Sequence, residues 1–234
     1  VHLVGQTIAN KAFPEESQAD GVRVWPWFLL TMMALLVYFF RSLSAMFITL
    51  FACLLAVIAG TGLVGFFKLT INDGVIASPI MILSMAFADG IHLVVNWIQA
   101  LHTGKDKRAA MLDSLSNNIG AMTVTSIMTC VSFLTLHFND SPPFQAIGYI
   151  VASGVFFALL FTLTITAPLL ILLPNKPPKT ISPLMKEDSP FVRHFADFVI
   201  NNYKVILLIM TIFAGSLIAF VPKNQVNDDI VKYY

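Results

Sequence analysis

Residues 75–101 read VIASPIMILSMAFADGIHLVVNWIQAL, an apolar run of 27 residues in which Asp89 is the only acidic or basic side chain apart from a histidine. Because roughly 20 apolar residues in a helix cross the hydrocarbon layer of a bilayer, this run is long enough to span a membrane. Placing a carboxylate near the bilayer centre costs roughly 3 kcal/mol on insertion scales, and a side chain kept there commonly has a function. The default hypothesis for Asp89 is a relay for ions or protons.

Five further apolar runs, each of 17 residues or more, lie along the 234-residue chain. The composition, 57% hydrophobic and 12% charged, is far from that of soluble globular proteins. A net charge of +1 gives no indication of a nucleic-acid partner. We predict an all-α membrane protein with a bundle of six transmembrane helices at residues 24–40, 45–67, 75–101, 119–138, 147–173 and 205–221.

Lysine and arginine are unevenly distributed between these runs. Nine of the 14 lie at residues 41–44, 102–118 and 174–204, and five lie in the alternate segments. Cytoplasmic loops carry the excess of basic residues in membrane proteins. We therefore predict that those three connections are cytoplasmic and that both termini lie outside.

The polar segments predict how the chain is divided. The expected parts are the end of a first external (periplasmic) domain (1–23), a five-helix transmembrane bundle (24–173), a cytoplasmic linker (174–204), the sixth transmembrane helix (205–221) and the start of a second external domain (222–234). The proline-rich stretch 174–183 cannot continue a helix, whereas Ser189 and Pro190 predict the start of an amphipathic helix. Another short amphipathic helix is expected within 105–118. We interpret the chain as part of a longer protein.

Small residues recur in the second span. Ala52, Ala56 and Gly60 lie four residues apart and are followed by Gly62 and Gly65, so one helix face lacks bulky side chains. Such spacing lets another helix approach closely in lipid, and we interpret it as packing rather than a ligand site. Both cysteines fall within predicted spans, where they are expected to pack rather than form a disulfide or bind metal.

The third span carries a polar stripe. At 100° per residue, Asp89, His92, Asn96 and Gln99 fall within an arc of about 80°. Lipid contact on that face would leave polar groups unsatisfied, so the stripe is expected to face other helices or water.

The fourth span offers a matching surface. Thr123, Ser126, Cys130 and His137 share an arc of about 60° on that helix. We predict that the third and fourth spans touch, with hydroxyl groups that hydrogen-bond Asp89 or hold a short chain of water molecules.

These patterns give the candidate site residues. Asp89 and His92 are the candidates for a proton relay, and Asn96, Thr123 and Ser126 are the candidates for supporting polar contacts. A structural role between helices is the alternative for Asp89, although a neutral asparagine would supply similar hydrogen bonds without the cost of a charge. For His92, packing and function are equally open. No spacing suits a closed metal site and no cofactor motif is present, so neither is predicted.

The sequence Ala88-Asp89-Gly90-Ile91-His92, with five spans, a cytoplasmic linker and a sixth span, resembles the resistance-nodulation-division (RND) superfamily of exporters. The resemblance is to its hydrophobe-exporter and MMPL-like branches, which are related to Patched-type proteins with sterol-sensing domains. It implies that the chain covers helices two to seven of such an exporter and that Asp89 is the proton-relay acid. Many relatives have Gly four positions before the acid, where this chain has Met85, and some have Tyr where it has Gly90.

The resemblance implies a proton-driven exporter of hydrophobic or amphipathic molecules such as lipids, in a bacterial inner membrane. Its expected partners are the bilayer, the cargo, the second half of the same protein and, in an assembly, further copies of itself. The alternative is a sterol- or lipid-sensing module that regulates a partner without moving protons. An intramembrane hydrolase built on Asp89 and His92 is disfavoured, because the sequence lacks a paired metal motif and a persuasive nucleophile.

Overall fold

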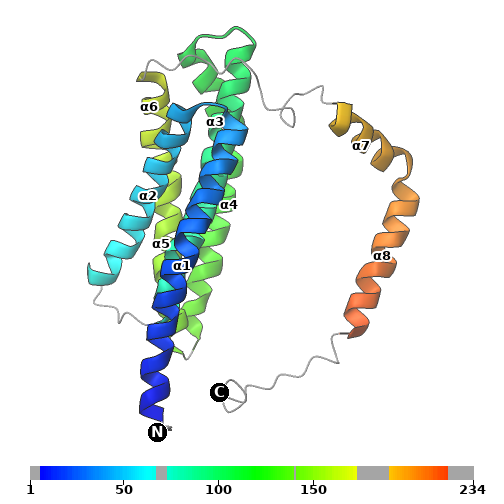
Figure 1. Cartoon of the computed structure of the whole chain (residues 1–234). Coiled ribbons are helices and arrows are strands. Elements are labelled where there is room, and N and C mark those ends of the chain that lie inside the picture. Colours follow the sequence, from blue (N-terminus) through cyan, green and yellow to red (C-terminus); the bar gives the residue numbers. More distant parts are fainter. Residues whose placement is uncertain (1–5, 67–72, 140, 173–189, 221–234) are drawn as a thin grey trace. The chain divides into compact units, whose positions relative to one another are not determined.

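The computed structural model describes residues 6–66, 73–139, 141–172 and 190–220, which are almost entirely helical and contain no strand (Figure 1). The chain divides into two compact units, Val1–Met185 and Lys186–Tyr234. The helices of the first unit are α1 (Gln6–Phe40), α2 (Leu43–Phe66), α3 (Asp73–His102), α4 (Lys107–Leu134), the 3-10 helix η1 (Thr135–Phe138), α5 (Pro142–Phe161), the π-helix η2 (Thr162–Thr166) and α6 (Ala167–Leu172). The second unit contains α7 (Pro190–Asn201) and α8 (Tyr203–Phe220).

Six helices in the described residues are long and apolar enough to cross a membrane, which confirms the predicted number. Their apolar segments are Arg23–Phe40, Leu43–Leu63, Val75–His102, Lys107–Phe138, Pro142–Leu172 and Tyr203–Phe220. Two predicted polar segments, the proline-rich stretch 174–183 and the start of an external domain at 222–234, lie outside the described residues. The predicted external segment 1–23 is helical from Gln6 onward and is continuous with the first span.

The fourth span differs from its predicted boundaries. The short amphipathic helix expected within 105–118 is not separate, because α4 runs without interruption from Lys107. No proline breaks this stretch, and Asp106 caps its start. A helical segment of 32 residues is about 48 Å long, more than the roughly 30 Å of a hydrocarbon layer. The charged first turns of α4 therefore extend beyond the apolar part of the span.

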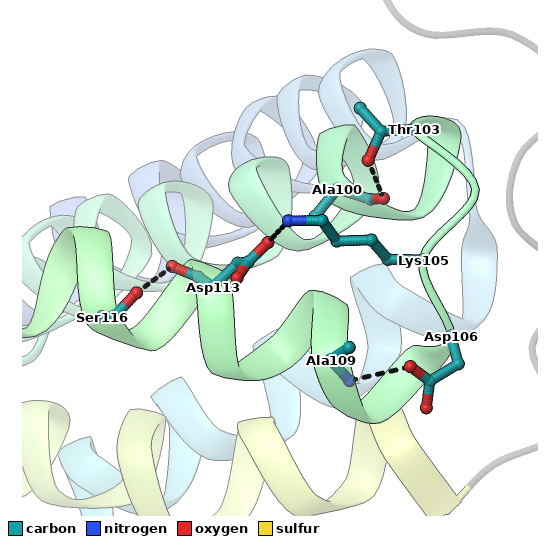
Figure 2. A network of polar contacts seen from close by, with 7 residues as sticks. All are labelled: Ala100, Thr103, Lys105, Asp106, Ala109, Asp113 and Ser116. Carbon is teal, nitrogen blue, oxygen red and sulfur yellow. Dashed lines mark hydrogen bonds and ion pairs between the residues drawn. The ribbon is translucent and has the colours of Figure 1, made fainter.

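The turn between α3 and α4 is fixed by local polar contacts (Figure 2). The Asp106 carboxylate accepts a hydrogen bond from the backbone N–H of Ala109 at 3.3 Å, and Lys105 forms an ion pair with Asp113. Both ion-pair partners are more than 40% exposed, so this pair contributes little to stability. The cap satisfies one of the free N–H groups at the start of α4.

In the first unit, α5 packs against α2, α3 and α4, and α1 packs against α2 and α3 (Figure 1). The contact between α3 and α4 confirms the prediction that the third and fourth spans touch. Described by itself, the second unit has α7 followed directly by α8. Helix α7 begins at Pro190, where the sequence predicts a helix start.

The small residues of α2 form the contact with α5. Ala52 and Ala56 are buried, and a Cβ atom placed on Gly60 would lie 2.7 Å from the Cα atom of Gly154 in α5. At that distance only glycine allows the two backbones to approach. The prediction of close helix packing is thus confirmed for Gly60, and the burial of Ala52 and Ala56 agrees with it, whereas a Cβ on Gly62 or Gly65 would meet nothing within 4 Å.

We expect Gly60→Ala to destabilise the bundle by about 1–3 kcal/mol, because the new methyl group overlaps a backbone atom that moves only if α2 and α5 separate. Gly62→Ala is the matched control on the same helix. It should be neutral or slightly stabilising, because alanine is the better helix former by about 1 kcal/mol. Thermal unfolding of the purified protein in detergent measures the difference. Equal midpoints for the two variants would contradict the α2–α5 contact.

Candidate functional site

Asp89 lies near the middle of α3 and is buried, with 7% of its surface exposed. Phe87, Leu93 and Val94 of the same helix are also buried, so Asp89 lies in a mainly apolar, buried part of α3. No lysine, arginine or histidine forms an ion pair with Asp89 among the described residues. The site is therefore a carboxyl group at membrane depth without a cationic partner in this part of the chain.

One described side chain hydrogen-bonds the carboxyl group. The Ser126 hydroxyl of α4 lies 3.3 Å from Oδ2 of Asp89, and Ser126 is itself 4% exposed. Ser126 was one of the predicted supporting residues, and the structure places its hydroxyl in contact with Asp89. The distance is longer than the 2.5–2.7 Å typical of a strong hydroxyl–carboxylate bond, so this contact holds the group weakly.

Helix α2 closes the site from another direction. A Cβ atom on Gly90 would overlap Cγ2 of Thr49, a residue that is 1% exposed. The Thr49 hydroxyl bonds the carbonyl of Ala45 in its own helix, so it presents its methyl group to α3. This close approach accounts for the glycine after the acid in this chain, because a larger side chain at residue 90 would push α2 away from α3.

A second polar contact joins α3 and α4. The Asn96 amide donates to Oδ1 of Asn118 at 2.8 Å, and the Asn118 amide donates to the Ser114 carbonyl at 2.7 Å. The Ser114 hydroxyl in turn donates to the Leu93 carbonyl of α3 at 2.6 Å. These bonds form an amide ladder (Asn96, Asn118 and Ser114) that fixes how α4 is rotated and placed along α3.

Asn118 and Ser114 were not among the predicted site residues. A signal for them exists in the sequence, because Ser114, Asn118 and Ser126 lie on one face of α4 at multiples of four residues, and all three are buried. The predicted span began at residue 119, which separated Asn118 from Ser126. The predicted supporting residue Asn96 pairs with Asn118, and no described hydrogen bond joins Asn96 to Asp89.

The other predicted residues do not contact Asp89. His92 is exposed on the surface of the bundle, about 60° around α3 from the buried carboxyl group. Thr123 is half-buried, and no described hydrogen bond joins its hydroxyl to Asp89. Cys130 donates from Sγ to the Ala152 carbonyl of α5 at 3.1 Å, in keeping with a packing role. In the described residues, no group of three or more His, Cys, Asp or Glu side chains could hold a metal ion.

Comparison with families of known proteins gives a match over most of the chain. The model of the MMPL family matches residues 1–187. The chain belongs to the MMPL family. A search among curated proteins finds no match to this MMPL chain. The predicted resemblance is confirmed, and family membership together with six apolar helices makes the MMPL chain a multi-pass membrane protein. The matched region contains Asp89, Ser126 and the amide ladder.

We expect Asn118→Leu to destabilise this MMPL protein by about 1–2 kcal/mol, because it leaves the Asn96 amide without its partner. Asn117→Leu is the matched control, since the neighbouring Asn117 is exposed. The double variant Asn96→Leu with Asn118→Leu should lose less than the sum of the single variants, because no amide is then left unpaired. Unfolding in detergent, analysed as a double-mutant cycle, measures this coupling. Additive losses would contradict the ladder.

Proposed function

We propose that this chain is the transmembrane part of a proton-driven exporter of hydrophobic or amphipathic molecules such as lipids, and that Asp89 takes up and releases the proton. Family membership supports a membrane exporter of lipid-like substrates. The proposed setting is a bacterial inner membrane with both termini outside, following the distribution of basic residues. The proposed protein contains a second half, and its function is transport rather than catalysis.

The contact between Asp89 and Ser126 carries this proposal. A serine hydroxyl both donates and accepts hydrogen bonds. When Asp89 is ionised, Ser126 donates to Oδ2; when Asp89 is protonated, its O–H donates to Oγ of Ser126. The same pair thus accommodates both protonation states without moving either helix, which a fixed ion pair with lysine or arginine does not allow. A group that serves only to join two helices has no need of this property.

His92 has a different place in the proposal. Its side chain lies on the bundle surface beside Ala88, which is also exposed. We propose that the second half of the protein covers this surface and that His92 assists proton transfer there rather than contacting Asp89 directly. The placement of His92 one helical turn from the acid supports this role.

Asp89→Asn in the full-length protein, reconstituted in vesicles with a proton gradient, should abolish proton-coupled export of a lipid cargo. The amide keeps a similar shape and hydrogen bonds but cannot exchange a proton. Cargo binding should persist. Undiminished export would refute the assignment. Lipid binding and partner regulation that both persist in Asp89→Asn, with no proton-coupled export by the wild type, would favour the lipid-sensing alternative.

Ser126→Ala should reduce export severalfold, because it removes the hydroxyl that accompanies Asp89 in both states. Ser126→Thr should restore most of the loss, since threonine keeps a hydroxyl at this position. Ser132→Ala is the matched control on α4, where the exposed hydroxyl bonds the Met128 carbonyl of its own helix. Export rates in the same vesicles measure all three. An equal loss for Ser126→Ala and Ser132→Ala would contradict the role of the Ser126 hydroxyl.

His92→Ala should lower export less than Asp89→Asn, because His92 has no described contact with the carboxyl group. Proton uptake measured alongside cargo movement would show whether the two remain coupled. Loss of export as complete as that of Asp89→Asn would show that His92 is itself an obligatory proton carrier.

A further inference from the structure

A pocket opens at the far end of α4 from the amide ladder, where η1 meets α5. Its volume is about 310 Å³, and its walls are Val131, Leu134, Thr135, His137, Phe138 and Tyr149. Val131, Leu134, Thr135 and Phe138 lie at positions i, i+3, i+4 and i+7, so they share one helix face. Val131, Leu134, Phe138 and Tyr149 are 38–85% exposed within the chain. The pocket therefore opens on the outside of the bundle, roughly 16 Å along the helix from Ser126.

His137 is held in a fixed orientation beside this pocket. Its Nδ1 lies 2.6 Å from the Tyr149 hydroxyl of α5, a contact between two elements that pack together. The rings of Phe138 and Tyr149 lie against the imidazole, with centroid separations of 5.8 Å and 5.4 Å. These contacts on two sides limit the rotation of the imidazole ring before any ligand binds.

The second nitrogen of this ring has no described partner. Neighbouring polar groups are satisfied locally: Thr135 donates to the Ser132 carbonyl, and Gln145 donates to the Asn139 carbonyl. When Tyr149 donates to Nδ1 of neutral His137, the proton of the ring resides on Nε2. Nε2–H is then a hydrogen-bond donor beside an apolar pocket, and it can bond an acceptor oxygen of a ligand.

The position of the pocket along the span indicates where that oxygen comes from. Phe138 is the last residue of the apolar segment Lys107–Phe138, and the polar residue Asn139 follows. Aromatic side chains with polar edges favour the level of the lipid headgroups. We therefore expect the apolar walls to face the hydrocarbon layer and the imidazole, at the end of the apolar segment, to lie near the phosphate groups. A molecule with an acyl chain and an anionic headgroup oxygen matches both parts.

We propose that this pocket binds one phospholipid of the surrounding bilayer. An acyl chain contacts Val131, Leu134 and Phe138, and a phosphate oxygen accepts a hydrogen bond from Nε2 of His137. A volume of about 310 Å³ is at the lower end for ligand pockets, so it holds the part of the lipid next to the headgroup rather than the whole molecule. The proposal is independent of proton transfer at Asp89.

Photolabelling of the full-length protein in nanodiscs tests the proposal. The probe is a phosphatidylcholine with a diazirine in the upper part of one acyl chain, and labelled peptides are quantified by mass spectrometry. Residues 131–149 should be labelled at least fivefold more than the stretch around Val124 and Ile127, which are similarly exposed on α4. Equal labelling of the two stretches, as expected for lipids without a defined site, would overturn the proposal.

Three variants examine the parts of the site. Leu134→Trp, which fills the pocket, should reduce labelling to the level around Val124, whereas the control Ile127→Trp should leave it unchanged. His137→Phe keeps an aromatic ring but removes the donor and should lower labelling about fivefold to tenfold, the effect of one hydrogen bond. Tyr149→Phe removes the hydroxyl that holds the imidazole of His137 and should lower labelling less than His137→Phe does. Each variant must elute as a single species in gel filtration before labelling.

A diacylglycerol carrying the same diazirine is the comparison probe, because it lacks the phosphate. It should label residues 131–149 several times less than the phosphatidylcholine in the wild type and equally in His137→Phe. Equal labelling by both probes in the wild type, or unchanged labelling in His137→Phe, would overturn the phosphate contact.

Discussion

Polar groups inside a hydrocarbon layer must find their hydrogen bonds within the protein, because no water is present to supply them. This constraint explains the arrangement of side chains around Asp89. Two polar contacts between α3 and α4, one from Ser126 to Asp89 and one along the amide ladder, fix the relative placement of these helices. Elsewhere on α4, Thr125, Thr129 and Ser132 bond carbonyl groups of their own helix, which satisfies them without a partner helix. Ser78 and Thr166 are exceptions, since their buried hydroxyls have no hydrogen-bond partner among the described residues.

Close backbone contacts provide the frame that keeps the carboxyl group buried. Lipid tails are as apolar as the helices, so helices in a membrane associate mainly through tight packing and polar contacts. The Gly60–Gly154 contact brings α2 to α5, and the Gly90–Thr49 contact brings α2 to α3 beside Asp89. In the proposed relay, enclosure of the carboxyl group on these sides limits the directions from which a proton can reach it. Such control of access is a requirement for coupling proton movement to transport.

Helix α4 and the 3-10 helix η1 that follows it carry polar side chains in two different surroundings. One face presents Ser114, Asn118 and Ser126 to α3, in the interior of the bundle. After α4 ends, the 3-10 helix η1 presents His137 to the outside of the bundle, where the Tyr149 hydroxyl of α5 contacts the imidazole. In the interior, the Ser126 hydroxyl can hydrogen-bond both the ionised and the protonated form of Asp89. On the outside, His137 lies at the edge of an apolar pocket. The continuous helical segment formed by α4 and η1 thus joins the candidate proton site to the proposed lipid pocket.

The sequence by itself determined the class of protein, the six apolar helices and the family that the chain resembles, and it singled out Asp89 as the candidate proton site. These conclusions follow from composition, the length of apolar runs and one local motif, none of which depends on how helices pack. The positions of Asp89, His92 and Asn96 on one stripe were also readable, because helical periodicity fixes angles within a helix.

Only the tertiary structure decided which of these side chains meet. Asp89 and His92 are only about 60° apart around α3, yet Asp89 is buried and His92 is exposed. The boundary between the buried and exposed faces of α3 depends on where α2 and α4 pack. The predicted fourth span began at residue 119, so Asn118 was left out of it, although α4 continues through this position. The pairing of Asn118 with Asn96 depends on the rotation of α4 about its axis. Periodicity gives the direction of a side chain within its own helix, but the partner in the next helix is set by the glycine contacts and the rotation of each helix about its axis.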